Sequence, residues 1–244
     1  MIELVNVTKV YAMGEVAVSA VAGISMSVET GELLSIVGQS GSGKSTLINI
    51  LGCLDVPSTG RYVLEGNDVG QLSDNQLAEL RGRKIGLIFQ TYNLLPRLSA
   101  QANVQLPLLY GGGKDGRERS IAALKKVGLG HRLKHRPNEL SGGEQQRVGI
   151  ARALVKNPSI ILADESTGNL DTQSGNDIMD ILHQLREEDG ITVLIVTHDP
   201  EVAASTDRVV SMRDGYLVDD QTPAEYIRSL SVPLSRSAPL RDSA

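Results

Sequence analysis

The stretch that decides the fold is ELLSIVGQSGSGKSTLINILGCL, residues 32–54. Its first part is short and nearly all apolar, which is typical of a strand buried on both faces, and it runs directly into glycines. Its last part, residues 45–54, has the apolar spacing of a helix. Two later runs, residues 159–164 and 192–198, are also short, apolar and β-branched, and a helix is predicted between them around residues 173–188. This alternation predicts an α/β fold with a parallel sheet.

The segments outside this alternation predict two further parts. Residues 2–10 and 24–28 have the alternating pattern of half-buried antiparallel strands. Residues 73–82 begin with a capping box and read as a helix, as do residues 115–130 and 141–156. We therefore expect an N-terminal antiparallel β-subdomain and a helical insertion between core strands. The expected boundaries are a core at 1–89 and 157–220, a helical subdomain at about 90–156, and a flexible Ser- and Pro-rich tail at 221–244.

Composition and charge exclude several classes of protein. The 244 residues are enough for a large buried core, and the net charge of -5 is unlike the basic excess of a general nucleic-acid binder. The single cysteine, Cys53, excludes an internal disulfide, and we expect it to be a small buried residue. The start of the chain lacks the apolar core of a signal peptide, and no stretch has the roughly 18 consecutive apolar residues of a membrane span. We therefore expect a cytoplasmic protein that needs a partner to act across a membrane.

The strongest motif is GQSGSGKS, residues 38–45, which fits G-x-x-x-x-G-K-[ST] between a strand and a helix. Gly41 and Gly43 let backbone N–H groups surround a phosphate, and Lys44 reaches the β and γ phosphates. The Ser45 hydroxyl is expected to bind Mg²⁺. The sequence therefore predicts that a nucleoside triphosphate is bound by Gly38, Gln39, Ser40, Gly41, Ser42, Gly43, Lys44, Ser45 and Thr46.

A pair of carboxylates follows at the end of the predicted strand 159–164. Asp164 is expected to bind Mg²⁺ through a water molecule, and Glu165 to accept a proton from an attacking water. Two solvated acids at a strand end are the simpler alternative, but beside a phosphate loop the pair predicts hydrolysis. His198, at the end of another buried strand, is expected to contact the γ phosphate or the water. The expected catalytic residues are thus Lys44, Glu165 and His198.

Two weaker signals complete the predicted site. Gln90 follows another strand-like run and is expected to add an oxygen ligand to Mg²⁺, although a glutamine in such a place is far more often inert. Tyr11 ends the first strand and is one of only seven aromatic residues, six Tyr and one Phe. We expect it to stack on the base of the nucleotide, and packing in the core or at the surface explains it equally well.

The stretch LSGGEQQR, residues 140–147, predicts a second anion site. Ser141 and Glu144 form a capping box at the start of a helix, where backbone N–H groups are free to bind an anion. With the motifs above, this stretch closely resembles one family, the ATP-binding subunits of ABC transporters, over about residues 1–220. The matching positions are Tyr11 for the A-loop, Gly38–Ser45 for Walker A, Gln90 for the Q-loop, Ser141, Gly142, Gly143 and Glu144 for the signature, Asp164 for Walker B, Glu165 for the catalytic glutamate, Asp171 in residues 168–171 for the D-loop, and His198 for the switch histidine.

The resemblance implies a P-loop NTPase fold with a RecA-like core, and ATP and Mg²⁺ as cofactors. It implies a head-to-tail homodimer in which each signature binds the ATP held by the partner's Walker A. It also implies an integral membrane permease subunit as partner, no nucleic acid, and a peripheral position on the cytoplasmic face of the inner membrane.

Three stretches, residues 49–66, 93–110 and 136–147, are most similar to the branch that contains MacB and LolD. This similarity implies a permease with a large extracytoplasmic domain, and export or extraction of a lipoprotein, peptide, lipid or drug-like substrate, or transmission of force alone. In that branch the segment near 90–110 meets the membrane partner. Interface and ordinary core packing are equally good accounts of its apolar residues Leu94, Leu95, Leu106 and Leu108.

The sequence also departs from that branch at two positions. Ser166 stands where proline usually follows the catalytic glutamate, which restores an N–H and loosens the backbone. Gly149 stands where the signature helix usually has alanine, at a cost of about 1 kcal/mol in helix propensity. Neither change removes a catalytic group.

Two other functions compete with a transporter ATPase. A soluble ABC-type ATPase acting on nucleic acid or the ribosome would generally have two fused cassettes or a long coiled-coil insertion, and the sequence has neither. A P-loop kinase or GTPase would leave LSGGE unexplained, and the sequence has no N-K-x-D guanine-binding motif.

Overall fold

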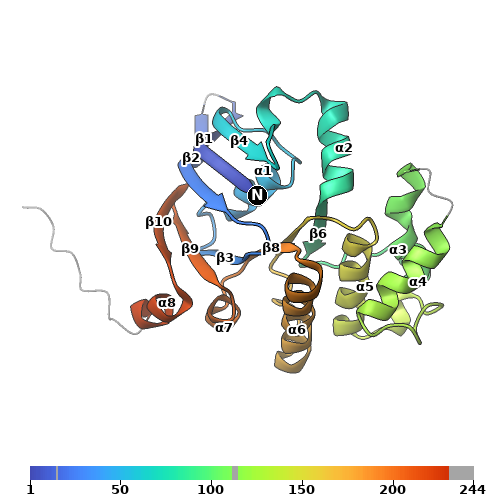
Figure 1. Cartoon of the computed structure of the whole chain (residues 1–244). Coiled ribbons are helices and arrows are strands. Elements are labelled where there is room, and N and C mark those ends of the chain that lie inside the picture. The colour runs from blue at the N-terminus through green and yellow to red at the C-terminus, as the bar shows by residue number, and fades with distance from the viewer. Residues whose placement is uncertain (15, 112–114, 231–244) are drawn as a thin grey trace, which may run out of the picture.

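The centre of the molecule is a six-stranded sheet (Figure 1), in a computed structural model that describes residues 1–14, 16–111 and 115–230. Its strands are Leu33–Gly38 (β3), Ile85–Phe89 (β6), Ile160–Asp164 (β7), Thr192–Val196 (β8), Arg208–Arg213 (β9) and Tyr216–Gln221 (β10). The order across the sheet is β10-β9-β3-β8-β7-β6, and every pair except β9–β10 is parallel. The predicted α/β fold with a parallel sheet is confirmed.

A second sheet has four antiparallel strands. They are Ile2–Met13 (β1), Val16–Val28 (β2), Thr59–Leu64 (β4) and Asn67–Asp68 (β5), in the order β2-β1-β4-β5. The two strands predicted at 2–10 and 24–28 are present, and both are longer than predicted. They extend beyond the predicted ranges because the backbone pairing of β1 with β2 continues as far as Met13 and Val16.

Helices cover both faces of the six-stranded sheet (Figure 1). They are Lys44–Leu51 (α1), Asp74–Lys84 (α2), Ala100–Gln105 (α3), Gly116–Lys126 (α4), Gly142–Leu154 (α5), Thr172–Asp189 (α6), Pro200–Ala204 (α7) and Pro223–Leu230 (α8), with 3₁₀ turns at Val69–Gln71, Leu106–Gly111 and Pro137–Glu139. α3, α4 and α5 pack on one another as a helical group beside the sheet. Within the described ranges, none of these helices combines the length and the apolar character needed to cross a bilayer.

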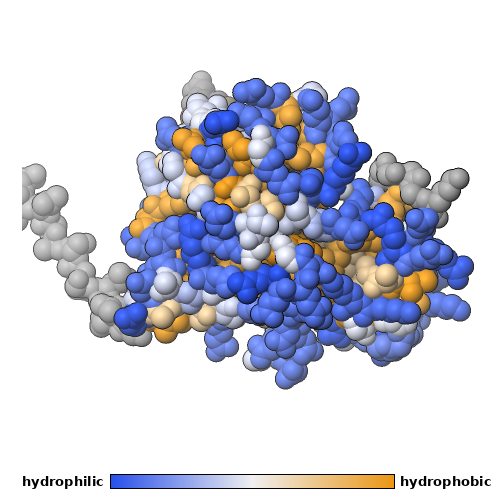
Figure 2. Space-filling model, in the orientation of Figure 1, coloured by the Kyte–Doolittle hydropathy of each residue, from blue (hydrophilic) through white to orange (hydrophobic). Residues whose placement is uncertain are grey.

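The core has two main parts, one on each face of the six-stranded sheet. Neighbouring strand residues alternate between them: Leu33 belongs to one part and Leu34 to the other. α1 and the four-stranded sheet fill one part, whereas α3, α4, α5 and α6 fill the other. This division explains why the sheet strands are continuous apolar runs. Most of the surface seen in Figure 2 is correspondingly hydrophilic, and its apolar areas are small.

The C-terminal segment is not the flexible tail expected from residue 221. β10 reaches Gln221, and α8 follows with Tyr226 only 8% exposed, in a small cluster with Val37. The Thr222 N–H and hydroxyl donate to Glu225 Oε2 over 2.9 and 2.8 Å, which fixes the start of the helix. The expectation is therefore wrong for residues 223–230, and residues 231–244 lie outside the described residues.

Gly149 offers a test of local stability in α5. An added Cβ would lie 3.9 Å from Gln146 Oε1 and 3.9 Å from the Tyr92 carbonyl oxygen, which is ordinary van der Waals contact. Because alanine is favoured over glycine in a helix interior, we expect Gly149→Ala to raise the free energy of unfolding by about 1 kcal/mol. Urea unfolding measures this change. Gly143→Ala is the matched control and should destabilise, since its Cβ would lie 2.9 Å from Ser174 Oγ; a destabilised Gly149→Ala protein would contradict the prediction.

Candidate nucleotide-binding site

The phosphate loop connects β3 to α1, and its glycines are required by close contacts. Gly41 and Gly43 have φ of 81° and 98°, in the left-handed region that favours glycine. A Cβ on Gly43 would lie 2.2 Å from the Ala20 carbonyl oxygen, and one on Gly38 would lie 2.4 Å from that of Met212. The loop is therefore pressed against the neighbouring backbone on two sides. Its N–H groups and the start of α1 form the kind of cradle that binds phosphate.

Lys44 lies in this cradle with only 8% of its surface exposed. Its Nζ donates to the carbonyl oxygens of Gly38 and Gln39, both over 2.8 Å. Burial lowers the pKa of Lys44, and the charges of Glu165 and Asp164 partly oppose that shift. The ammonium thus lies within the field of both predicted acids, as a phosphate-binding lysine at this site requires.

The carboxyl ends of three parallel strands bring the other predicted residues together. Phe89 of β6 and Val196 of β8 are the register partners of Asp164 at the end of β7. Gln90 directly follows β6, and His198 comes two residues after β8, so both are placed beside Asp164 and Glu165. Ligands of open parallel sheets bind at this edge.

Asp164 is the residue best suited to bind a cation. Burial raises its pKa, the charge of Glu165 raises it further, and Lys44 lowers it. A divalent ion beside Asp164 would relieve both unfavourable effects. Ser45 and Gln90 would add a hydroxyl and an amide oxygen, and this all-oxygen set with few protein ligands fits Mg²⁺, which keeps several waters and binds phosphate oxygens. The residues present therefore fit the expected ion.

Glu165 and His198 form a pair at the mouth of the sheet. His198 Nδ1 lies 3.1 Å from Glu165 Oε1. The Glu165 backbone has a φ of 45°, an unusual value for a residue with a side chain, and its N–H donates to the Val196 carbonyl over 2.9 Å. This left-handed backbone turns the carboxylate out of the line of β7. The arrangement suits a general base whose orientation is fixed by a neighbouring side chain.

Gln90 and Tyr11 lie at the edges of this site. The Gln90 carbonyl accepts a hydrogen bond from Asn169 Nδ2 over 3.2 Å, next to the segment that follows Glu165. Tyr11 is 36% exposed, its hydroxyl donates to Asp55 Oδ2 over 2.9 Å, and the Lys9 ammonium lies 5.2 Å from its ring centre. Burial and the Asp55 carboxylate raise the pKa of Tyr11. The sequence did not reveal Asp55 and Lys9, because neither belongs to a motif.

The predicted capping box at the start of α5 is confirmed. The Glu144 N–H donates to Ser141 Oγ over 3.2 Å, and the Ser141 N–H donates to Glu144 Oε2 over 2.9 Å. That backbone hydrogen bond and the Arg132 guanidinium lower the pKa of Glu144. Cβ atoms on the two glycines that follow Ser141 would lie within about 3 Å of Tyr92 and Ser174 side-chain oxygens, so the glycines also let the helix pack closely.

The signature helix α5 and the helix α1 that follows the phosphate loop lie on opposite faces of the six-stranded sheet. The apolar residues of α1 belong to the core on one face, and those of α5 to the core on the other. Asp171 caps the start of α6, on the same face as α5, and accepts from the Ser174 N–H and hydroxyl over 3.0 and 2.8 Å. The helix that follows the phosphate loop and the helix that begins at the signature thus pack on different faces of the sheet.

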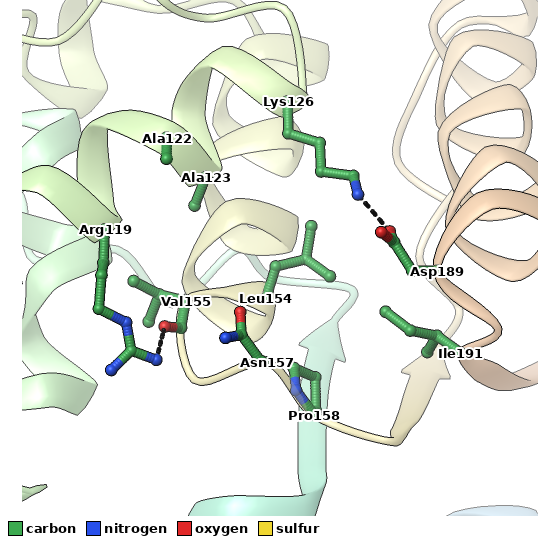
Figure 3. A pocket seen from close by; sticks show the side chains of 10 residues that line it. All are labelled: Arg119, Ala122, Ala123, Lys126, Leu154, Val155, Asn157, Pro158, Asp189 and Ile191. Carbon is green, nitrogen blue, oxygen red and sulfur yellow. Dashed lines mark hydrogen bonds and ion pairs between the residues drawn. The ribbon is translucent and has the colours of Figure 1, made fainter.

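A pocket of about 470 Å³ lies elsewhere, between α4, the end of α5 and the start of β8 (Figure 3). Lys126 and Asp189 form an ion pair at its rim, and the Arg119 guanidinium donates to the Val155 carbonyl over 2.7 Å. None of the residues that line it belongs to the predicted nucleotide site. It is a crevice between the helical group and the sheet.

Known proteins match this chain closely. The profile of the ABC transporter family matches residues 21–168. The macrolide export ATP-binding/permease protein MacB of Syntrophobacter fumaroxidans is 50% identical over 221 residues, which are 89% of this chain and 31% of MacB. The uncharacterized ABC transporter ATP-binding protein YknY of Bacillus subtilis is 51% identical over 220 residues, 89% of this chain and 95% of YknY. The chain thus spans about a third of MacB and nearly all of YknY.

Solved structures agree with these relatives. The dimeric bacterial ABC transporter cassette MJ0796 has a TM-score of 0.84 and 45% identity, over 91% of this chain and 99% of that one. A second dimeric structure of MJ0796, in a post-hydrolysis state with ADP and Pi, has the same TM-score and 44% identity, with the same coverage. The family profile covers more than half of the chain, and the fold and the order of motifs agree with it. The chain belongs to the ABC transporter family.

Proposed function

We propose that this chain is the ATP-binding and ATP-hydrolysing subunit that powers an ABC transporter through ATP-driven dimerisation. The observation that carries the proposal is that the signature helix α5 and the helix α1 that follows the phosphate loop pack on opposite faces of one sheet. Within one chain they face different surroundings, whereas two chains arranged head to tail bring each signature to the other's phosphate loop. Two nucleotides then join two subunits, as the dimeric cassettes of similar structure support.

The proposed chemistry uses the residues at the ends of β3, β6, β7 and β8. The phosphate loop binds the triphosphate, and Lys44 neutralises charge that develops on its terminal phosphates. Ser45, Gln90 and Asp164 would hold Mg²⁺, which when bound supplies further positive charge to the phosphate oxygens. Glu165 accepts the proton of the attacking water, and His198 orients the Glu165 carboxylate. When the γ phosphate is lost, the signature of the partner subunit no longer has a phosphate to bind, so the dimer opens.

The proposed partner is an integral membrane permease with a large extracytoplasmic domain, supplied by another chain or by residues beyond this sequence. The named MacB relatives combine ATP-binding and permease parts, and this chain spans only about a third of their length. We place the subunit on the cytoplasmic face of the inner membrane. The proposed substrate class is a lipoprotein, peptide, lipid or drug-like molecule.

A groove beside the end of β6 is the proposed docking surface for that permease. It has a volume of about 350 Å³ and is lined by Leu54, Phe89 and Pro107, among others. The nearby Leu95 and Leu109 are 49% and 67% exposed, which suits an interface. Leu94 and Leu108 instead pack on the core, so core packing rather than an interface explains these two apolar residues.

Light scattering on the Glu165→Gln variant tests the dimer. With hydrolysis slowed, Mg–ATP should double the solution mass, and a further Ser141→Arg change should abolish the doubling by placing a bulky side chain at the signature. Gln173→Arg, on the exposed start of α6, is the control for added size and charge. A doubled mass that persists in the Ser141→Arg variant would show that the signature does not bind the partner's nucleotide, and an absence of doubling with saturating ATP would contradict dimerisation driven by ATP alone.

A further inference from the structure

A buried glutamine joins the signature helix to the end of β6 and to the loop after β7. Gln146 lies in α5, five residues after Ser141, and is completely buried. Its Nε2 donates to the Ser166 carbonyl oxygen over 2.8 Å and to that of Phe89 over 3.4 Å. Ser166 directly follows Glu165, and Phe89 directly precedes Gln90. One side-chain amide therefore contacts the backbone next to the proposed base and next to a proposed metal ligand.

The orientation of this amide is fixed by its acceptors. Turning it over would place Oε1 against two carbonyl oxygens, so only the observed orientation is favourable. Gln146 Oε1 itself has no hydrogen-bond partner among the described residues, and neither has the buried hydroxyl of Ser166. Leaving a buried polar atom unpaired is costly, and such an atom in a folded protein calls for a functional explanation. The Gln146 amide thus binds two carbonyl oxygens with its N–H groups and leaves its own oxygen without a hydrogen bond among the described residues.

The backbone directly before the Ser166 carbonyl that Gln146 contacts is strained at Glu165. Glu165 has a left-handed φ of 45°, a conformation that persists only when surrounding contacts hold it. The Val196 carbonyl accepts the Glu165 N–H on one side, and Gln146 binds the next carbonyl on the other. Arg152, two turns further along α5, donates to the Tyr92 and Asn93 carbonyls and so attaches the segment after Gln90 to the same helix. A shift of α5 would move both loops.

We propose that Gln146 is a positioning residue that couples docking of the signature on a partner's nucleotide to the placement of Glu165 and Gln90. This rests on the proposed function, because docking of Ser141 is what would shift α5. When α5 moves, the Gln146 amide carries the Ser166 and Phe89 carbonyls with it. Turnover then depends on a correctly seated partner, since a monomer leaves α5 without the contact that sets its position.

Gln146→Met tests the coupling, because methionine keeps the length of the side chain and removes its N–H donors. We expect kcat to fall on the order of 10- to 100-fold, the loss typical of a displaced catalytic group, while the affinity for Mg–ATP changes less than about twofold. Gln145→Met is the matched control on the same helix. Gln145 Nε2 donates to the Leu140 carbonyl over 3.2 Å, at the start of its own helix. The change therefore leaves the hydrogen bonds to the Phe89 and Ser166 carbonyls in place, and kcat should be nearly unchanged.

A second measurement requires no turnover and also shows that the variant is folded. In the Glu165→Gln background, Mg–ATP should slow amide hydrogen exchange in residues 141–150 and in 164–171. With Gln146→Met added, protection of 141–150 should remain and that of 164–171 should be lost. Equal protection of both segments, or an unchanged kcat, would overturn the coupling. Failure of the proposed function looks different: ATP would then neither double the mass nor protect 141–150 in the parent.

Discussion

Replacing Glu165 by glutamine should lower the kcat for ATP hydrolysis by roughly 10²- to 10⁴-fold, the usual contribution of a general base. The side chain keeps its size and its place beside His198, so the hydrogen-bonding position 3.1 Å from Nδ1 is retained. What is lost is the ability to accept a proton from the attacking water. The affinity for Mg–ATP should remain close to that of the parent, because the phosphate loop is untouched. Single-turnover hydrolysis and equilibrium binding of ATP measure the two quantities separately.

Glu188→Gln is the control for this experiment. Glu188 accepts a hydrogen bond from Gln184 on the exposed side of α6, away from the site, so the same chemical change should leave kcat unaffected. A Glu165→Gln protein that hydrolyses ATP at more than about a tenth of the parent rate would assign the proton transfer to another group, with His198 the next to test.

Lys44→Ala should weaken ATP binding by roughly 10- to 150-fold. The ammonium is held in the phosphate loop by two carbonyl oxygens, and a hydrogen bond to a charged group contributes about 1.5–3 kcal/mol. The truncation also removes the positive charge of Lys44, which lowers the pKa of Asp164. Titration calorimetry with ATP in excess Mg²⁺ measures the loss.

Lys126→Ala is the matched control for Lys44→Ala. Lys126 pairs with Asp189 at the rim of the pocket in Figure 3, so its removal deletes a lysine charge without changing the phosphate loop. Its ATP affinity should equal that of the parent. If Lys44→Ala bound ATP within about twofold of the parent, the phosphate would be bound elsewhere and the proposed site would be wrong.

The fold could be predicted where local pattern and burial agree. β3, α1, β7, α6 and β8 were predicted within a few residues, because strands buried on both faces give continuous apolar runs and a phosphate loop marks the turn between strand and helix. Neither α8 nor the outer halves of β1 and β2 could be predicted in this way. α8 is short and is stabilised by the packing of Tyr226 in a cluster with Val37, Ala203 and Val209, of which Val37 is distant in sequence.

The site could be predicted as a set of residues, and only partly as a set of contacts. Lys44, Glu165 and His198 follow from motifs, because the chemistry requires those side chains at strand ends. The contact of Tyr11 with Asp55 and the contacts of Gln146 with two carbonyl oxygens depend on which distant segments lie nearby. A glutamine in a helix is an ordinary surface residue by composition, and only the tertiary structure shows that Gln146 contacts the end of β6 and the loop after β7 at once.

The position of β3 in the sheet has a consequence for synthesis. Both neighbours of β3, which are β8 and β9, begin more than 150 residues later in the chain. During translation at roughly 5–20 residues per second, this apolar strand is made about 8 to 30 s before either neighbour exists. Until then its backbone N–H and carbonyl groups are open to incorrect pairing. The strand that leads into the nucleotide loop is therefore made well before the two strands that complete its place in the sheet, and its open edges need protection in the interval.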